Sequence, residues 1–182
     1  MDMTEKTLKS ELLFDGKILH VYKDIIELPN KKEAFREYIK HMGAVCVIPV
    51  TDDGNVILVK QYRYAVERPL LEIPAGKLDT PDEDPMSAAI RELKEETGAT
   101  AKNITPLGLY LGSPAILSEK IHMYLATGLT IGETSPDEDE FLEIFEIPLE
   151  KAVKMVLDGE IPDGKTQSAI LRAAAMLGVL KL

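Results

Sequence analysis

An almost unbroken apolar run at residues 43–50 (GAVCVIPV) most constrains what this chain can fold into. A run of this length without a charged side chain predicts a strand buried inside a sheet. A second run, residues 55–63 (NVILVKQYR), follows after Thr51-Asp52-Asp53-Gly54. We expect the Asp-Gly pair to close a tight hairpin turn between these two strands.

The other predicted elements surround this pair of strands. Residues 17–28 and 33–40, joined by a turn at 29–32, predict an N-terminal hairpin, although Phe35, Tyr38 and Ile39 in the second arm also fit helical spacing. Few strands alternate regularly with helices, which favours an α+β mixed sheet sandwiched by helices over a doubly wound fold. We expect a β-hairpin region at 1–41 and a main domain at 42–182. The remaining strands are expected near 70–74, 105–112, 120–127 and 141–147, and the helices near 86–98, 149–158 and 165–179.

Acidic residues give the chain of 182 residues a net charge of −10, which argues against a bare nucleic-acid binder. The charge is concentrated in two segments. Residues 72–99 carry eight acids and three bases (−5), and residues 133–150 carry eight acids and no base (−8), which leaves +3 for the rest. These two segments are the first candidates for a site that binds cations.

Cysteine content and hydropathy indicate the cellular compartment in which the protein is expected. Cys46 is the single cysteine, so neither an intramolecular disulfide nor a cysteine-based zinc cluster can form. No run approaches 18 apolar residues, and residues 1–14 lack the apolar core of a signal peptide. We therefore expect a cytoplasmic protein with Cys46 buried in its strand.

The predicted helix at 86–98 segregates its charges. Helical spacing places Glu92, Glu95 and Glu96 within an arc of about 100°, with Glu96 beside the apolar stripe and Arg91 within reach of Glu95. The alternative is a solvated helix face. Like charges at i,i+4 destabilise a bare helix, however, so Glu92 and Glu96 need a cation. Clustered carboxylates suit Mg²⁺ or Mn²⁺.

The residues around this helix resemble a known motif. The stretch from Gly76 to Ala99, with Glu83 and the run Arg-Glu-Leu-Lys-Glu-Glu-Thr-Gly at 91–98, resembles the Nudix box. Six residues, rather than the family's five, separate Gly76 from Glu83. Further segments resemble the ADP-ribose pyrophosphatase branch of the Nudix hydrolases: 36–45, 61–63, 72–76, 113–114 and 137–141.

This resemblance implies a fold, a reaction and an assembly. The fold would be an α/β/α sandwich with a mixed sheet and an N-terminal antiparallel β-region. The reaction would be Mg²⁺-dependent hydrolysis of ADP-ribose to AMP and ribose 5-phosphate, with Mn²⁺ as a possible substitute. The assembly would be a homodimer that exchanges its N-terminal β-regions and shares its active sites.

The resemblance also implies roles for single residues. Glu138 would be the general base, and Arg91 would orient Glu95. Arg63 would bind the pyrophosphate or terminal ribose, which suits a guanidinium because it binds phosphate in a bidentate manner. The metal ligands would be Glu92, Glu96, Glu95, Glu140 and the carbonyl of Ala75. Other substrate contacts would come from Arg36 and Glu37 of the partner subunit and from Glu72, Lys77, Ser113 and Glu119.

Three other functions remain as alternatives. The chain could hydrolyse a nucleotide sugar with another base, or it could remove damaged nucleoside triphosphates. The N-terminal hairpin and Ser113-Pro114 favour a nucleotide-sugar substrate over a triphosphate. A non-catalytic ADP-ribose sensor would have lost carboxylates of the box, and this sequence retains all of them.

Overall fold

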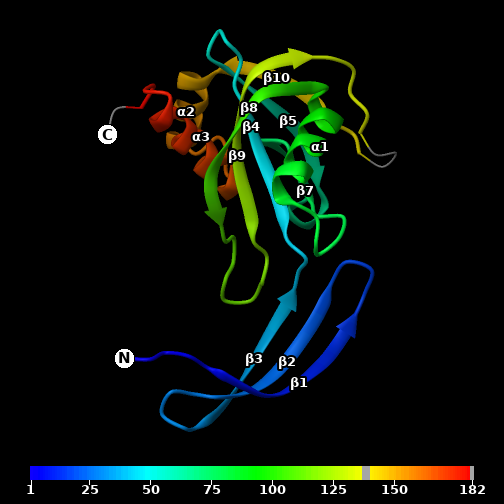
Figure 1. Ribbon diagram of the computed structural model, residues 1–182, viewed down its shortest axis with the longest axis vertical. Coiled ribbons are helices and arrows are strands. Elements are labelled where there is room, and N and C mark those ends of the chain that lie inside the picture. The colour runs from blue at the N-terminus through cyan, green and yellow to red at the C-terminus, as the bar shows by residue number, and fades with distance from the viewer. Residues whose placement is uncertain (137–139, 181–182) are drawn as a thin grey trace. The chain divides into compact units, whose positions relative to one another are not determined.

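The computed structural model describes residues 1–136 and 140–180. Contacts divide the chain into two compact units (Figure 1). Unit 1 comprises Met1–Gly43 and Leu111–Lys120, and unit 2 comprises Ala44–Tyr110 and Ile121–Leu182. Within the described residues, no helix is long and apolar enough to cross a membrane.

Unit 1 is built on an antiparallel sheet with the order β1-β2-β3: β1 (Lys6–Asp15), β2 (His20–Glu27) and β3 (Glu33–Lys40). The predicted hairpin is present as β2 and β3, and its second arm is a strand. Lys31 adopts a left-handed conformation (φ 67°) in the turn and donates its N–H to the Leu28 carbonyl. Strand β1 was not predicted.

The segment Leu111–Lys120 belongs to unit 1 although it is distant in sequence. Its Ile116 carbonyl accepts a hydrogen bond from the Ile39 N–H (2.8 Å), and its Ser118 N–H donates to the Ile39 carbonyl (3.0 Å). The Ser118 hydroxyl also accepts from the His41 N–H. These bonds attach the segment to the end of β3.

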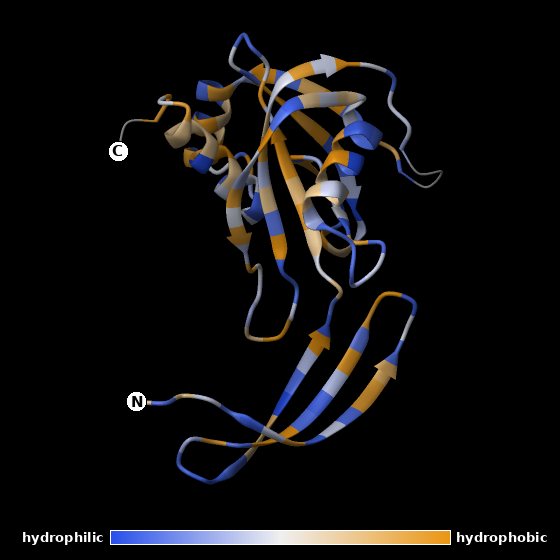
Figure 2. Cartoon of the chain, in the orientation of Figure 1, coloured by the Kyte–Doolittle hydropathy of each residue, from blue (hydrophilic) through white to orange (hydrophobic). Residues whose placement is uncertain are grey.

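Apolar side chains remain exposed on β1 and the loop after it. All ten residues of β1 are exposed. Leu8, Leu12, Leu13 and Phe14 lie on the strand, and Ile18 and Leu19 follow it. Figure 2 shows hydrophobic stretches along this sheet beside hydrophilic ones. Unit 1 by itself therefore leaves an apolar surface uncovered.

Among its described residues, unit 2 contains two sheets and three helices. One sheet has the order β10-β5-β6: β10 (Glu143–Pro148), β5 (Asn55–Arg63) and β6 (Arg68–Glu72). The other has the order β7-β4-β9-β8: β7 (Ala75–Lys77), β4 (Ala44–Pro49), β9 (Ile121–Ile131) and β8 (Ala99–Tyr110). Strands β4 and β9 are parallel and the other pairs antiparallel, so this sheet is mixed, as expected. The helices are α1 (Pro85–Thr97), α2 (Leu149–Leu157) and α3 (Gly164–Met176), and a short 3-10 turn covers Tyr64–Val66.

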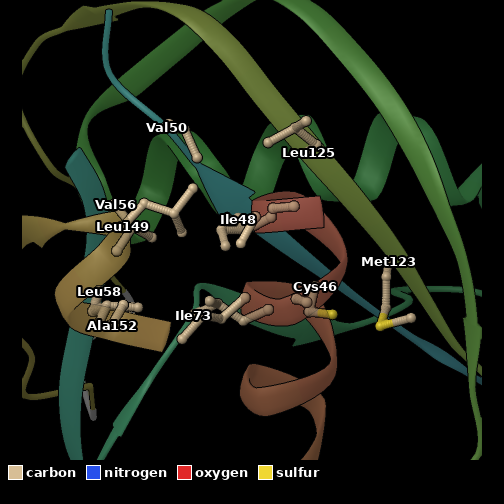
Figure 3. Packing of buried hydrophobic residues seen from close by; sticks show 14 of the residues in the cluster. Cys46, Ile48, Val50, Val56, Leu58, Ile73, Met123, Leu125, Leu149 and Ala152 are labelled. Carbon is tan, nitrogen blue, oxygen red and sulfur yellow. The ribbon is translucent and has the colours of Figure 1, made fainter. Parts of the chain in front are cut away.

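Strand β4 lies in the middle layer of unit 2. Cys46 and Ile48 pack in one hydrophobic cluster with residues of α2 and α3, and Val45 and Val47 pack in another with Leu93 of α1. Figure 3 shows side chains of the first cluster, among them Cys46, Ile48, Ile73 and Met123. All six residues of β4 are buried. Helices therefore cover both faces of this strand, which is the expected α/β/α sandwich.

The loop between β4 and β5 forms the predicted turn but does not join a hairpin. Gly54 has φ 80°, and its N–H donates to the Thr51 carbonyl. Strand β4 pairs with β7 and β9, however, and β5 pairs with β6 and β10. One isolated bridge, Val50 to Val56, connects the two strands. The prediction of a β4–β5 hairpin was wrong because the turn leads the chain from one sheet into the other.

Helix α1 begins and ends where its sequence predicts. The Asp84 side chain caps it by accepting from the Ser87 N–H, and Pro85 occupies its first position. Gly98 ends it with φ 69°, and a Cβ there would lie 2.3 Å from the Gly132 carbonyl oxygen. Both the conformation and the close approach therefore require glycine at position 98.

Candidate active site

The site of unit 2 is centred on two carboxylates that α1 buries against β7. Glu92 and Glu96 are 8% and 2% exposed. The Ala75 N–H donates to Glu96 Oε2 over 3.3 Å. A Cβ on Gly76 would lie 1.9 Å from Glu92 Oε1, so the absence of a side chain there gives the Glu92 carboxylate its space. This contact is a physical reason for the first glycine of the motif.

Burial raises the pKa of both carboxyl groups. The pKa of Glu96 rises to about 8 because the group is desolvated, and the charges of Glu92 and Glu140 add to the effect. Burial likewise raises the pKa of Glu92, against the attraction of Arg91. The effect of Glu140 shows that its charge acts on this pair. The site thus concentrates negative charge that a bound cation would stabilise.

Arg91 holds the acidic groups around α1 in place. Its Nη1 donates to Glu92 Oε1 (2.8 Å) and to Glu95 Oε2 (3.0 Å), which confirms the predicted contact with Glu95. Its Nη2 lies 3.5 Å from Glu83 Oε1 and donates to the Lys77 carbonyl over 3.3 Å. Glu83 therefore reaches Arg91 despite the extra residue after Gly76. Burial lowers the pKa of Arg91, but the surrounding carboxylates outweigh this effect and raise it.

The donor chemistry of this centre fits a hard divalent cation. Carboxylate oxygens are the ligands that Mg²⁺ and Mn²⁺ prefer. Burial raises the pKa of Glu92 and of Glu96, and a bound cation would oppose this effect. Ala75 lies beside Glu96, to which its N–H donates a hydrogen bond. No group of three or more His, Cys, Asp or Glu side chains within residues 1–136 and 140–180 is already arranged to hold a metal ion. Glu92 in particular is turned toward Arg91.

Arg63 and Glu72 form a second charged element, at the ends of β5 and β6. Arg63 Nε donates to Glu72 Oε1 (2.7 Å) and Nη2 donates to Oε2 (2.6 Å). Glu72 is 1% exposed, whereas the Arg63 side chain is 40% exposed. Burial raises the pKa of Glu72, but Arg63 and Lys165 outweigh it and leave the pKa lowered. The buried carboxylate thus fixes one edge of the guanidinium, and the other edge is accessible.

Sequence reasoning did not find Lys165, the second partner of Glu72. Lys165 lies in the first turn of α3, and its Nζ donates to Glu72 Oε2 (2.5 Å) and to Asp163 Oδ2 (3.0 Å). Asp163 caps α3, and Thr166 beside it donates its hydroxyl to Asp163. The capping pattern predicts a helix start, but no local pattern connects Lys165 with a glutamate 93 residues away.

The remaining predicted residues lie in several places. The Lys77 side chain is exposed at the end of β7. Glu140 lines an open groove of about 500 Å³ together with Tyr62 and Phe141. The predicted general base, Glu138, lies outside the described residues.

Four predicted substrate contacts belong to unit 1. Arg36 forms a bidentate ion pair with Glu5, and Glu37 lies opposite Lys23 in the sheet. The Ser113 carbonyl accepts from Ile116 and Leu117, and Glu119 Oε1 lies 3.5 Å from His41 Nδ1. Their roles in binding substrate remain predictions.

Comparison with known proteins identifies the family. The profile of the NUDIX domain matches residues 40–167, which is more than half of the chain. This chain belongs to the Nudix family. The profile of the nucleoside diphosphate sugar hydrolase N-terminal domain matches residues 5–39. The Nudix profile therefore includes α1 and its acidic centre.

Individual relatives of this Nudix protein cover nearly all of its length. An ADP-ribose pyrophosphatase of Bacillus subtilis (strain 168) is 46% identical over 170 residues, covering 92% of this chain and 91% of the relative. A GDP-mannose pyrophosphatase of Yersinia enterocolitica is 33% identical over 194 residues and covers both chains completely. A crystal structure of an ADP compounds hydrolase superposes with a TM-score of 0.85 at 25% identity, covering 98% of this chain and 97% of that one.

Proposed function

We propose that this chain is a divalent-metal-dependent pyrophosphohydrolase of nucleoside diphosphate sugars, with ADP-ribose as the preferred substrate. The observation that carries the proposal is the pair of buried, mutually repelling carboxylates Glu92 and Glu96 in the same unit as the partly exposed, oriented Arg63. The first element attracts cations and the second attracts phosphate. A diphosphate substrate needs both, because its negative charge repels nucleophiles.

Different residues of the chain are proposed to bind the metal ion and to transfer the proton. Glu92, Glu96, Glu140 and the Ala75 carbonyl are the proposed ligands of Mg²⁺ or Mn²⁺, with Glu95 oriented by Arg91 as a further candidate. A divalent ion bound there supplies charge neutralisation of the diphosphate and a lowered pKa of water. Glu138 accepts the proton of the attacking water while the bond from the attacked phosphorus to the bridging oxygen breaks. The products from ADP-ribose are AMP and ribose 5-phosphate.

Arg63 binds the diphosphate or the terminal ribose in this proposal. A guanidinium presents its donors in a fixed plane, so its orientation decides which oxygens it can reach. Glu72 was expected to touch substrate. Since both of its oxygens accept from Arg63 and Lys165, we assign it a positioning role instead.

Base preference is the main alternative within this function. The names of the relatives include both ADP-ribose and GDP-mannose pyrophosphatases. The higher identity to the former and the ADP compounds hydrolase structure support an adenine nucleotide. The lining of the groove beside Glu140 includes both an aromatic and a cationic side chain, Tyr62 and Lys60.

A homodimer with shared active sites is part of the proposal. The exposed apolar residues of β1 support it, because a protein surface rarely leaves such a cluster without a partner. Arg36 and Glu37 of each subunit would then contact substrate bound to the other. A cytoplasmic location stays a prediction from the single cysteine.

A substrate panel tests the proposed function. The purified protein is assayed with Mg²⁺ and, separately, Mn²⁺ on ADP-ribose, ADP-glucose, GDP-mannose, UDP-glucose and the nucleoside triphosphates, and the products are identified. We expect AMP and ribose 5-phosphate from ADP-ribose, with the highest kcat/KM of the panel. Preferred release of pyrophosphate from a triphosphate would refute the assignment to nucleotide sugars, and ADP-ribose binding without turnover would indicate a sensor.

A further inference from the structure

The geometry points to Lys165 as a positioning residue that acts on substrate through Glu72 and Arg63. This inference rests on the proposed function and adds a residue to it. Lys165 does not need to touch substrate: its side chain is 12% exposed and its ammonium donates to two carboxylates of the protein. What it controls is where the Arg63 guanidinium points.

The two oxygens of Glu72 are divided between two cations. Oε1 accepts from Arg63 Nε, and Oε2 accepts from both Arg63 Nη2 and Lys165 Nζ. Arg63 Nη1 makes no hydrogen bond within the described part of the chain, so this end of the guanidinium can donate to a phosphate oxygen. The carboxylate plane of Glu72 therefore sets the direction of the accessible donors of Arg63.

Lys165 connects this carboxylate to the start of α3. Its ammonium lies between Glu72 and Asp163, two carboxylates of like charge that share it as a donor. Thr166, the next residue, accepts from the Ile73 N–H (3.0 Å) and donates to Asp163 (2.6 Å). The N-terminus of α3 thus holds both the side chain of Glu72 and the backbone that follows it.

Loss of the ammonium would act on orientation. Without Lys165, Glu72 and Asp163 face each other with no cation between them, and Glu72 is nearly completely buried. A buried carboxylate that loses a charged partner moves or takes up a proton. A shift of the Glu72 carboxylate would change the plane that orients Arg63, and protonation would weaken its hydrogen bonds to the guanidinium, although Arg63 itself is intact in both cases.

Steady-state kinetics of Lys165→Met test the inference. Removing a residue that orients a metal ligand typically costs about 10- to 100-fold, and we expect a cost at the lower end of this range for a residue that orients Arg63. We expect KM for ADP-ribose to rise by about tenfold, with kcat changing by less than about threefold. Lys165→Arg, which keeps a charged donor, should recover most of the loss in KM. Lys154→Met in α2, which removes an exposed lysine paired with Asp158, is the matched control and should behave as wild type.

A double-mutant cycle shows whether Lys165 acts through Arg63. Arg63→Ala should raise KM more than Lys165→Met does, and adding Lys165→Met to Arg63→Ala should change KM by less than about twofold. Multiplicative effects of the two changes would overturn the inference, because they would mean independent action. An unchanged KM in Lys165→Met with a lower melting temperature would also overturn it, because a merely structural role reduces the folded fraction and hence kcat alone.

Binding of inorganic pyrophosphate separates this inference from the proposed function. Calorimetry with pyrophosphate and Mg²⁺ uses the same four proteins of the cycle and needs no turnover. If wild type hydrolyses no nucleotide sugar, the proposed function fails, and non-additive losses of pyrophosphate affinity still support the link between Lys165 and Arg63. If wild type is active but Lys165→Met binds pyrophosphate and ADP-ribose normally, the positioning role fails alone.

Discussion

Replacing Glu96 by glutamine should stabilise the metal-free protein at alkaline pH. The pKa of Glu96 is raised from 4.5 to about 8, so the folded state holds a proton that the unfolded state releases between these two values. The contribution of Glu96 to stability is therefore complete below about pH 4.5, falls as the pH rises through this interval, and is lost above about pH 8. Glutamine removes this dependence because it stays neutral.

The size of the effect follows from the two pKa values. Between pH 5 and pH 9, a carboxyl group with these values loses on the order of 4 kcal/mol of stability, taking about 1.4 kcal/mol per pKa unit. Urea unfolding in the presence of a chelator measures this loss in wild type and Glu96→Gln at both pH values. We expect the difference in the free energy of unfolding, Glu96→Gln minus wild type, to increase by about 4 kcal/mol between pH 5 and pH 9.

Two comparisons make this experiment decisive. Glu160→Gln removes an exposed carboxyl group in the loop after α2 and should follow the pH dependence of wild type. Saturating Mg²⁺ at pH 9 should restore stability to wild type and much less to Glu96→Gln, because the ion stabilises the ionised carboxylate. A relative change below about 1 kcal/mol between the two pH values would refute the reasoning that Glu96 is buried without a compensating cation.

Three further changes test other parts of the site and the assembly. Glu138→Gln should lower kcat by about 10²- to 10⁴-fold with little change in KM, whereas Asp139→Asn should not; the reverse order would assign the base elsewhere. Gly76→Ala should raise the Mg²⁺ concentration for half-maximal activity by about tenfold or more at little cost in melting temperature, because its Cβ would displace the Glu92 carboxylate. A normal metal requirement would contradict this contact. Leu12→Glu in β1 should convert a dimer to a monomer in sedimentation velocity, and a wild type that sediments as a monomer would remove the shared-site proposal.

Local sequence patterns predicted the acidic centre because its geometry is itself local. Glu92 and Glu96 lie on one helix, so the helical spacing by itself places them side by side. The capping residue Asp84 and the terminating Gly98 also act over a few residues. Such features follow from the helical repeat and from backbone sterics, so the sequence of a short segment is enough to predict them.

Features set by pairing between distant segments were not predictable in this way. Strand β1 mixes Lys, Ser and Glu with its apolar residues and is exposed throughout, so no burial pattern marks it. The Asp-Gly turn at residues 53–54 is compatible with a hairpin and with a passage between sheets, and only the partners of β4 and β5 distinguish the two. The contact of Lys165 with Glu72 depends on where α3 begins relative to β6.

The division of unit 1 into two sequence segments has a consequence for chimeras of related proteins. The profile of the N-terminal domain ends at residue 39, but Leu111–Lys120 completes the same unit. A chimera that exchanges residues 1–43 alone would join β3 of one protein to the 111–120 segment of another and place their hydrogen bonds at risk. Such an exchange would also combine Ser113 and Glu119 of one protein with residues 36 and 37 of the other. A chimera that keeps these hydrogen bonds would therefore have to exchange both segments together.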